Sequence, residues 1–346
     1  MSGKLAAALT AAKAETNAPG VIAGVWIGNR SWTVTRGATS RGGETRPKLT
    51  GHTRIGSVTK TFTGTVILQL VAEGKIRLDE PIDRWFPKAR NGGSITVRDL
   101  GTMASGIDSY TANASIVDQY LTRPRTVWKQ STLINAGLGM PQKFTPGNGF
   151  QYSNTNFVML GRIIEKVTRK PIATVMQNRI FRPLGMKQSS YPSTPKLPAP
   201  YWNGDTTQGA TGDSIRNATH WSPTFEAAAG QIVSTLSDMG RYTKALGTGS
   251  LITPRLQKVR LQPNPASVAG GREYDFALGT DHGWLAHSGE VPGYNSQVGY
   301  LPSKKAAIVI FTNTDIANPD GASPASSLFS ALAKVVSPKY VPSGAH

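Results

Sequence analysis

The feature that most constrains the fold is a pair of β-hairpin patterns, one at each end of the chain. Val21 to Ile27 and Trp32 to Thr35 are apolar, β-branched runs on either side of a Gly-Asn turn. Near the C-terminus, Gln297 to Leu301 and Ala306 to Thr312 flank a turn that contains Pro and Ser. Runs of this kind around short turns predict antiparallel hairpins. We therefore expect both ends of the chain to contribute to one sheet.

Helical periodicity replaces this pattern between the two hairpins and returns after the second one. Apolar residues recur at helical spacing over Thr59 to Glu73 and Asn156 to Val167, from Ser237 onward, and again over Ala325 to Val336. The stretch from Ser189 to Pro223 is rich in Pro, Gly, Ser, Thr and Asn, which predicts a loop.

These patterns predict an α/β protein with an antiparallel sheet flanked by helices. The sheet-plus-helix domain is expected to be discontinuous, formed by residues 1–75 and 225–346. A mostly helical insert would occupy residues 76–224. We expect the functional site in the cleft between the two parts.

Composition limits the classes of function. Among 346 residues, 38 are Lys or Arg and 20 are Asp or Glu, so the formal net charge is +18. The basic residues are scattered and no nucleic-acid motif accompanies them, which favours a generally basic surface over a specific nucleic-acid binder. An anionic cell-wall polymer stays open as a partner. The absence of Cys excludes a disulfide framework, a thiolate nucleophile and Cys-ligated zinc.

Targeting signals are weak. No apolar run approaches the ~20 residues of a membrane-spanning helix. The N-terminus carries one Lys and a brief apolar stretch, which is more typical of a short amphipathic helix than of a signal peptide. We expect either an extracytoplasmic, secreted protein whose signal has been removed or a cytoplasmic protein.

The first candidate for chemistry is Ser57-Val58-Thr59-Lys60, directly before an amphipathic helix. The i, i+3 spacing places Ser57 and Lys60 on one face of the first turn. Backbone N–H groups at a helix N-terminus favour developing negative charge on Ser57. A Lys whose pKa is lowered by burial could take the serine proton. Taken alone, the pair is more typical of a helix cap and a solvated lysine.

Two later motifs could complete such a site. In Tyr152-Ser153-Asn154, the phenol could join a proton relay and the amide could bind a substrate carbonyl together with Lys60. In His287-Ser288-Gly289, an apolar run enters a Gly-rich bend, which is typical of an edge strand whose backbone faces a pocket. Each motif alone also fits a core aromatic, a helix cap or a surface His.

Together, the Ser-x-x-Lys, Tyr-x-Asn and His-x-Gly motifs resemble those of the penicillin-recognising serine hydrolases. The branch they resemble contains D-alanyl-D-alanine carboxypeptidases, class C β-lactamases, esterases and D-aminopeptidases. The resemblance runs from about Ala18 to Thr312, and further segments carry it: 54–75, 95–106, 177–186 and 229–238. It implies a β-lactamase/transpeptidase-like fold, penicillin binding and a D-configured peptide, β-lactam or ester as substrate, with no metal or organic cofactor.

The resemblance also implies roles for residues. Ser57 would form the acyl-enzyme, and Lys60 and Tyr152 would share its proton. The backbone N–H groups of Ser57 and Glu290 would form the oxyanion hole. Asn154, His287, Ser288 and Gly289 would bind the substrate or support the electrostatics of the site.

One residue departs from the carboxypeptidase pattern. Carboxypeptidases of this branch usually have a hydroxyl at the position of Glu290 and an Arg nearby, and both pair with a substrate carboxylate. Here the expected strand Phe276 to Gly283 has no Arg, and a carboxylate opposite a carboxylate is repulsive.

The leading hypothesis is a D-alanyl-D-alanine carboxypeptidase-type peptidase. If Glu290 points into the pocket, an amidase, aminopeptidase or esterase is favoured instead. The motifs are also compatible with a β-lactamase and, more remotely, with a non-catalytic protein that senses penicillin or binds the cell wall.

Overall fold

The computed structural model describes residues 1–212, 214–271 and 273–342. Its central sheet contains seven strands in these ranges, in the order β2-β1-β11-β10-β9-β8-β7. The strands are β1 Gly20–Ile27, β2 Arg30–Gly37, β7 Glu273–Tyr274, β8 Gly279–Asp281, β9 Trp284–Val291, β10 Tyr294–Leu301 and β11 Ala306–Thr312. All neighbouring pairs are antiparallel. The antiparallel sheet built from both ends of the chain is therefore confirmed.

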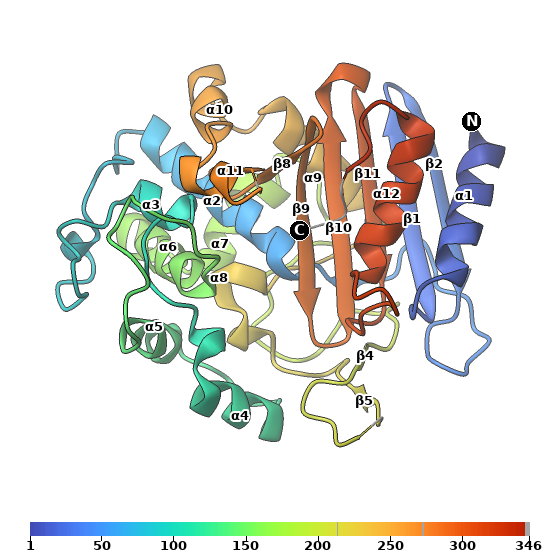
Figure 1. Cartoon of the computed structure of the whole chain (residues 1–346), viewed down its shortest axis with the longest axis horizontal. Coiled ribbons are helices and arrows are strands. Elements are labelled where there is room, and N and C mark those ends of the chain that lie inside the picture. Colours follow the sequence, from blue (N-terminus) through green and yellow to red (C-terminus); the bar gives the residue numbers. More distant parts are fainter. Residues whose placement is uncertain (213, 272, 343–346) are drawn as a thin grey trace.

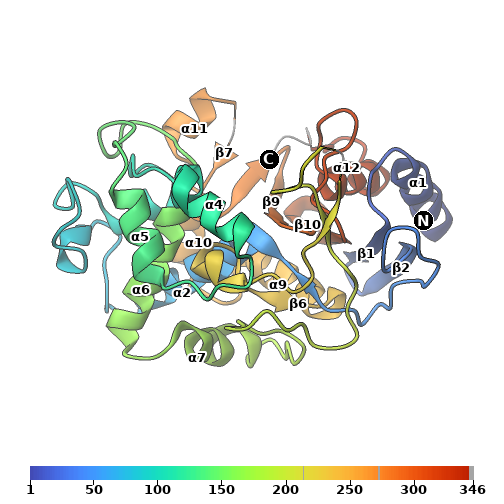
Figure 2. The same cartoon turned by 90° about the horizontal axis from the view of Figure 1, so that it is seen from below.

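Helices cover both faces of the sheet (Figures 1 and 2). The helices α1 Ser2–Ala14 and α12 Pro324–Val336 pack together on one face, and α9 Leu236–Thr248 packs on the other. Leu5 and Leu9 of α1 and Leu328 and Leu332 of α12 are buried in this outer layer. Burial of these apolar stripes stabilises the layer, because each removes apolar surface from water.

A helical region lies beside the β9 side of the sheet (Figure 1). Its long helices are α2 Thr59–Ala72 and α6 Asn154–Thr168, which pack against each other. The shorter helices are α3 Val97–Gly101, α4 Ala114–Thr122, α5 Gln130–Leu138, α7 Ile172–Met176, α8 Ala227–Gly230, α10 Pro254–Arg260 and α11 Pro265–Ala269. The remaining strands form two short pairs, β3 Thr53–Arg54 with β6 Val233–Ser234 and β4 Asp205–Thr206 with β5 Arg216–Asn217. In the described part of the expected loop over 189–223, the strands are β4 and β5, and a 3₁₀ turn begins at Pro223.

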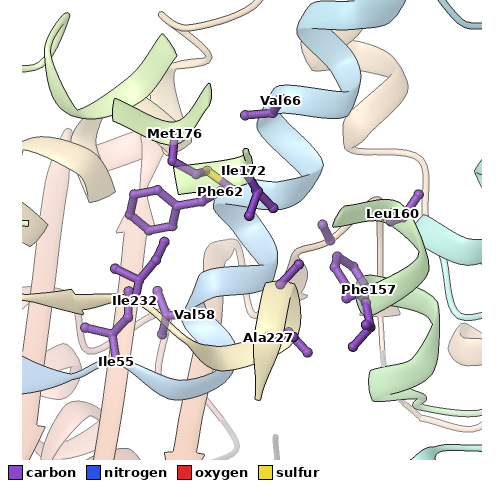
Figure 3. Close-up of a cluster of buried hydrophobic side chains, with 14 of the residues drawn as sticks. Ile55, Val58, Phe62, Val66, Phe157, Leu160, Ile172, Met176, Ala227 and Ile232 are labelled. Carbon is purple, nitrogen blue, oxygen red and sulfur yellow. The ribbon is translucent and has the colours of Figure 1, made fainter. Parts of the chain in front are cut away.

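The start of α2 is fixed by a dense apolar cluster (Figure 3). Val58, Phe62 and Val66 project from this segment into side chains of α6, α7 and α8. Phe62 also stacks on Tyr242 of α9 with ring centroids 3.5 Å apart. Because all of these side chains are buried, the first turn of α2 has little freedom to move. The residues at that turn are thereby held in one position.

Candidate active site

The Ser57 hydroxyl lies next to the Lys60 ammonium. Ser57 belongs to a 3₁₀ turn, Gly56–Val58, that leads directly into α2, and Lys60 is in the first turn of that helix. Lys60 Nζ donates to Ser57 Oγ at 2.8 Å and to the carbonyl oxygen of Ala229 at 3.0 Å. The structure therefore brings the two residues together as their spacing predicts.

The environment of Lys60 weakens its hold on a proton. Its side chain has no exposed surface, and burial lowers the pKa of Lys60 to about 7, although the carboxylate of Glu226 acts in the opposite direction. Phe157 and Tyr152 present their rings to Nζ, with the Tyr152 ring centroid at 4.9 Å. A lysine of this kind is partly neutral near pH 7, so it can act as a base.

Tyr152 completes the group around Ser57. It lies two residues before α6 and lines the same cavity as Ser57. Burial raises the pKa of Tyr152 well above its usual range, and contact with the Ser57 hydroxyl only partly offsets this. The phenol therefore keeps its proton at neutral pH, which makes it a hydrogen-bond donor rather than a phenolate base.

Asn154 stands at the start of α6, and its side-chain amide bonds to the segment before α4. It is the first residue of α6, its backbone N–H donates to Ser109 Oγ at 3.2 Å, and its Nδ2 donates to Thr111 Oγ1 at 3.4 Å. It makes no hydrogen bond with Lys60, whose bonds go to Ser57 and Ala229. Within the described residues, the buried Asn154 Oδ1 has no hydrogen-bond partner.

The strand β9 lies directly against the Ser57 turn. The ideal Cβ of an alanine at Gly289 would lie 2.0 Å from the carbonyl oxygen of Ile55, and one at Gly56 would lie 2.7 Å from the backbone nitrogen of Glu290. Real side chains do not tolerate such distances, so both positions require glycine. This close approach sets the backbone of Glu290 beside Ser57.

The N–H group of Glu290 points away from β10, toward the side of β9 where the Ser57 turn lies. The hairpin of β9 and β10 turns at Pro292-Gly293, and the closing pair is Val291 with Tyr294. In an antiparallel ladder the hydrogen-bonded pairs alternate, so Glu290, paired with Asn295, directs its N–H away from β10. Because β8 pairs with β9 only as far as Ala286, that edge of the strand is open at Glu290. This N–H therefore faces the site with that of Ser57.

His287 is buried in β9, and its ring nitrogens contact groups other than Ser57. Its Nδ1 lies 2.6 Å from the carbonyl oxygen of Ser288, and its Nε2 lies 3.3 Å from the hydroxyl of Tyr274. These contacts orient the ring as part of the cavity wall.

A cavity of about 320 Å³ opens beside Ser57. Its wall contains apolar rings from Phe150 and Tyr274, the β9 segment from Ala286 to Glu290, and a second acidic residue, Glu273. Within the part of the chain that the structure describes, no Lys or Arg lines it. The wall formed by the described residues is therefore acidic, although the molecule as a whole is strongly basic.

The orientation of Glu290, which the sequence leaves open, is into this cavity. Asn295 Nδ2 donates to Glu290 Oε2 at 3.2 Å, and Ser323 Oγ donates to Asn295 Oδ1; both partners line the cavity. Burial and the nearby Asp315 raise the pKa of Glu290, and the Asn295 bond lowers it. A chain of hydrogen bonds thus holds the carboxylate at the cavity wall.

Sequence reasoning missed several residues of the site. Glu273 and Tyr274 were not identified because they lie before the expected strand, which is much shorter in the structure. Asn295 and Ser323 carry no motif of their own. Glu226 stands only three residues before Ala229, but its proximity to Lys60 depends on the tertiary packing of α8 against α2.

Neither a group of metal ligands nor a membrane-spanning helix is found among the described residues. In residues 1–212, 214–271 and 273–342, no three His, Asp or Glu side chains group in a way that could hold a metal ion. Over the same ranges, no helix has both the length and the apolar composition to cross a membrane.

An antiparallel sheet flanked by helices, with Ser-x-x-Lys at the start of a buried helix, defines a β-lactamase/transpeptidase-like serine hydrolase. A model of the beta-lactamase family matches residues 5–333, nearly the whole chain. This chain therefore belongs to the beta-lactamase family, within the penicillin-binding and serine hydrolase superfamily, as its motifs predict.

Individual relatives extend the comparison. A D-stereospecific amidohydrolase from Streptomyces sp. has the same fold with a TM-score of 0.86 and 29% identity, covering 96% of this chain and 98% of that one. A D-amino acid amidase from Ochrobactrum anthropi SV3 has a TM-score of 0.84 at 23% identity, covering 97% of this chain and 98% of that one. The D-alanyl-D-alanine-carboxypeptidase/endopeptidase AmpH of Escherichia coli (strain K12) is 28% identical over 52% of this chain and 47% of its own length. Other curated relatives are likewise matched over only 52 to 61% of their length.

Proposed function

We propose that this chain is an amidohydrolase that cleaves amides and peptides of D-amino acids through an acyl-enzyme on Ser57. The observation that carries the proposal is the acidic wall of the cavity, where Glu273 and Glu290 stand without an opposing cation among the described residues. A free carboxylate at the end of a substrate would be repelled there, whereas a neutral amide or an ammonium group would not. This favours an amidase or aminopeptidase over a carboxypeptidase.

The reaction follows from the geometry around Ser57. Neutral Lys60 accepts the proton of Ser57 Oγ, and Oγ bonds to the substrate carbonyl carbon. The N–H groups of Ser57 and Glu290 stabilise the negative charge that develops on the carbonyl oxygen. When the C–N bond breaks, one proton reaches the leaving nitrogen, either directly from Lys60 or by way of the Tyr152 phenol, which gives up its own proton and takes that of Lys60. Water then attacks the ester and regenerates Ser57.

The D configuration is supported by the relatives. The Streptomyces protein is described as D-stereospecific and AmpH as a D-alanyl-D-alanine-directed enzyme. An amidohydrolase releases an amine, whereas a carboxypeptidase releases an amino acid with a free carboxylate. The acidic cavity of this chain favours the amidohydrolase reaction. A carboxypeptidase, an esterase and a β-lactamase remain outcomes that the same experiment distinguishes, as does a non-catalytic penicillin-sensing protein.

The test is a panel of substrates with the wild-type protein and a Ser57→Ala variant. The panel contains D-phenylalanine amide, L-phenylalanine amide, a D-Ala-D-Ala peptide with a free carboxylate, a short nitrophenyl ester and a β-lactam. We expect the D-amide to have the highest kcat/KM and the S57A variant to have none. Preferential turnover of the D-Ala-D-Ala peptide, or of the β-lactam, would contradict the proposal. No turnover and no mass increase on Ser57 with any compound would contradict the enzyme proposal and favour a non-catalytic binding protein.

A Glu290→Gln variant tests the charge argument. Its amide side chain can still bond to Asn295, but the like charge is gone. We expect kcat/KM for the D-Ala-D-Ala peptide to rise by about tenfold relative to that for D-phenylalanine amide. Glu44→Gln, an exposed acid outside the cavity, is the matched control and should leave the ratio unchanged. An unchanged ratio in E290Q would show that Glu290 does not select the leaving group.

The cellular setting of this activity is part of the proposal. A D-amino-acid substrate would fit an extracytoplasmic location near an anionic cell-wall polymer, which the net charge of +18 would attract. Fractionation of the native host cells would test the location, and cosedimentation with purified cell wall would test the contact.

A further inference from the structure

The acylation mechanism leaves one partly buried acidic residue near Lys60 without a role. Glu226 stands directly before α8, the short helix whose Ala229 carbonyl accepts a hydrogen bond from Lys60. Its side chain does not line the cavity of about 320 Å³. Instead it faces a narrow cavity of about 10 Å³, lined also by Arg54, Gly230 and Val291. This space is about the size of one water molecule.

The backbone of α8 is shaped around this carboxylate. The ideal Cβ of an alanine at Gly230 would lie 2.9 Å from the Cβ of Glu226 and 3.2 Å from its Oε2. Ala227, the next residue, is buried with φ +42°, a left-handed conformation that is costly for a residue with a Cβ. The packing therefore tolerates local strain where it encloses Glu226.

The carboxylate has no direct partner in the part of the chain that the structure describes. No donor lies within hydrogen-bonding distance of it, and no Lys or Arg nitrogen lies within ion-pair distance. Arg54 Nη2 donates hydrogen bonds to the carbonyl oxygens of Pro195, Thr219 and Trp221. The buried Nε and Nη1 of Arg54 have no hydrogen-bond partner among the described residues. A partly buried carboxylate that neutralises no contact ion acts through longer-range charge.

The charged and titratable groups around Glu226 come from several elements. They are Lys60 of α2, Arg54 of β3, Glu290 of β9, Tyr120 of α4, and Tyr110 and Tyr152 before α4 and α6. Burial raises the pKa of Glu226 to about 7, while Lys60 and Arg54 act to lower it. In return, the Glu226 carboxylate raises the pKa of Lys60. The phenols of Tyr110, Tyr120 and Tyr152 keep their protons near neutral pH. The groups that change protonation in this range are therefore Glu226 and Lys60.

We propose that Glu226 is a positioning residue that sets the proton occupancy of Lys60 and, through it, the pH range in which Ser57 is acylated. With Glu226 ionised, Lys60 holds its proton up to a higher pH and is a base for Ser57 only above it. With Glu226 neutral or absent, Lys60 releases its proton at lower pH. Glu226 itself touches neither Ser57 nor the substrate cavity. The inference rests on the Ser57 acyl-enzyme of the proposed function, but not on the identity of the substrate.

The test follows the reaction of Ser57 with an alkyl fluorophosphonate from pH 5 to 9, measured by intact mass. In this reaction Oγ bonds to phosphorus, the P–F bond breaks, fluoride leaves and Lys60 accepts the proton. We expect the acid limb of the wild-type rate to lie near neutrality and that of Glu226→Gln to lie about one pH unit or more lower. Glu226→Asp keeps the charge, so it should restore most of the wild-type profile.

Asp275→Asn is the matched control. Burial raises the pKa of Asp275, like that of Glu226, to about 7, but Lys60 is not among the groups that affect it. D275N should therefore label with the wild-type acid limb, which excludes Asp275 as the source of that limb. A limb that moves in D275N and stays in E226Q would overturn the inference.

Two further outcomes are decisive. If E226Q does not fold, as judged by circular dichroism, Gly230→Ala replaces it, because the added Cβ displaces the carboxylate. An unmoved limb in the variant that folds would overturn the role of Glu226 while leaving Ser57 as the nucleophile. No labelling of the wild-type protein at any pH would overturn the acyl-enzyme itself and this inference with it.

Discussion

Lys60 shows how burial converts an ordinary pair of residues into a reactive one. An ammonium group in solvent has no reason to release its proton near neutral pH, and a serine beside it would serve as a helix cap. In this fold the lysine side chain is wholly enclosed, with one bond to Ser57 Oγ and one to a carbonyl oxygen. Desolvation disfavours the charged form, so the neutral base becomes accessible.

A Lys60→Met variant tests this role at the level of one residue. Met fills a similar volume without a nitrogen, so Ser57 loses its base but the core stays packed. We expect the rate of Ser57 acylation by a nitrophenyl ester at pH 8 to fall by about 10² to 10⁴.

Lys166→Met is the matched control for K60M. Burial also lowers the pKa of Lys166, but its Nζ donates to the carbonyl oxygen of Trp85, in a different part of the molecule from Ser57. It should leave the rate unchanged. A K60M rate within about threefold of the wild type would argue against Lys60 as the base.

At the level of elements, the regular pieces were predictable because their signals are local. Both hairpins, α2, α6, α9 and α12 agree with the periodicity, and their bounds differ from the expected ones by a few residues. The expected strand Phe276 to Gly283 was wrong in extent. The structure has strands only at Glu273–Tyr274 and Gly279–Asp281, with a turn between them in which Ala277 has φ +62°. Nothing in the sequence marks that turn, because Ala rarely adopts this conformation.

The residues of the site likewise fall into those that a local pattern predicts and those that only tertiary packing brings together. Ser57 and Lys60 are predictable because one helical turn joins them. The acidic residues were predicted only in part: Glu290 was named but its side-chain direction was left open, and Glu226 and Glu273 were missed. Their proximity to Ser57 arises from packing between elements that are distant in sequence, which no local pattern records.

The contact between β9 and the Ser57 turn is an element-level feature that a single methyl group can disrupt. In a Gly289→Ala variant, the new Cβ would meet the Ile55 carbonyl oxygen at 2.0 Å and Ser296 Oγ at 2.5 Å, so the strand must move away. We expect a loss of about 1–3 kcal/mol in the free energy of unfolding and a larger fall in kcat than in binding, because the oxyanion donors separate.

Gly270→Ala is the control for G289A, since a Cβ there finds only ordinary contacts at 3.5 Å. Denaturant unfolding and steady-state kinetics on both variants provide the comparison. Wild-type kcat in G289A would mean that the close approach of the two backbones is not needed for the reaction.

At the scale of the whole molecule, the charge of the surface and the charge of the cavity have opposite signs. The chain carries +18 overall, yet the cavity beside Ser57 is lined by Glu273 and Glu290. Long-range attraction of anions is screened within about 10 Å at ordinary ionic strength, whereas the carboxylates act at contact distance. Under the proposed function, the net charge would act on where the molecule accumulates, and the cavity would act on which substrate it takes.

The free energy of unfolding should also depend on the protonation of one buried acid, Asp275. Asp275 has about 1% of its surface exposed, its Oδ2 accepts a hydrogen bond from Thr280 at 2.8 Å, and its buried Oδ1 has no partner within the described residues. Burial, with a contribution from Glu273, raises the pKa of Asp275 to about 7. The folded protein therefore holds a proton on this group at pH values where the unfolded chain has released it.

Asp275→Asn should remove this dependence of stability on pH. In the wild type, the contribution of Asp275 is greatest below its usual pKa of 3.8 and is lost as the pH rises to about 7, because ionisation is easier in the unfolded chain. Asn keeps the Thr280 bond without the charge. We expect the melting temperature of D275N minus that of the wild type to increase from pH 4 to pH 7, by a few degrees, and then to level off. Asp79→Asn, an exposed acid, should give a constant difference. A constant difference for D275N as well would mean that Asp275 is ionised in the folded protein throughout this range.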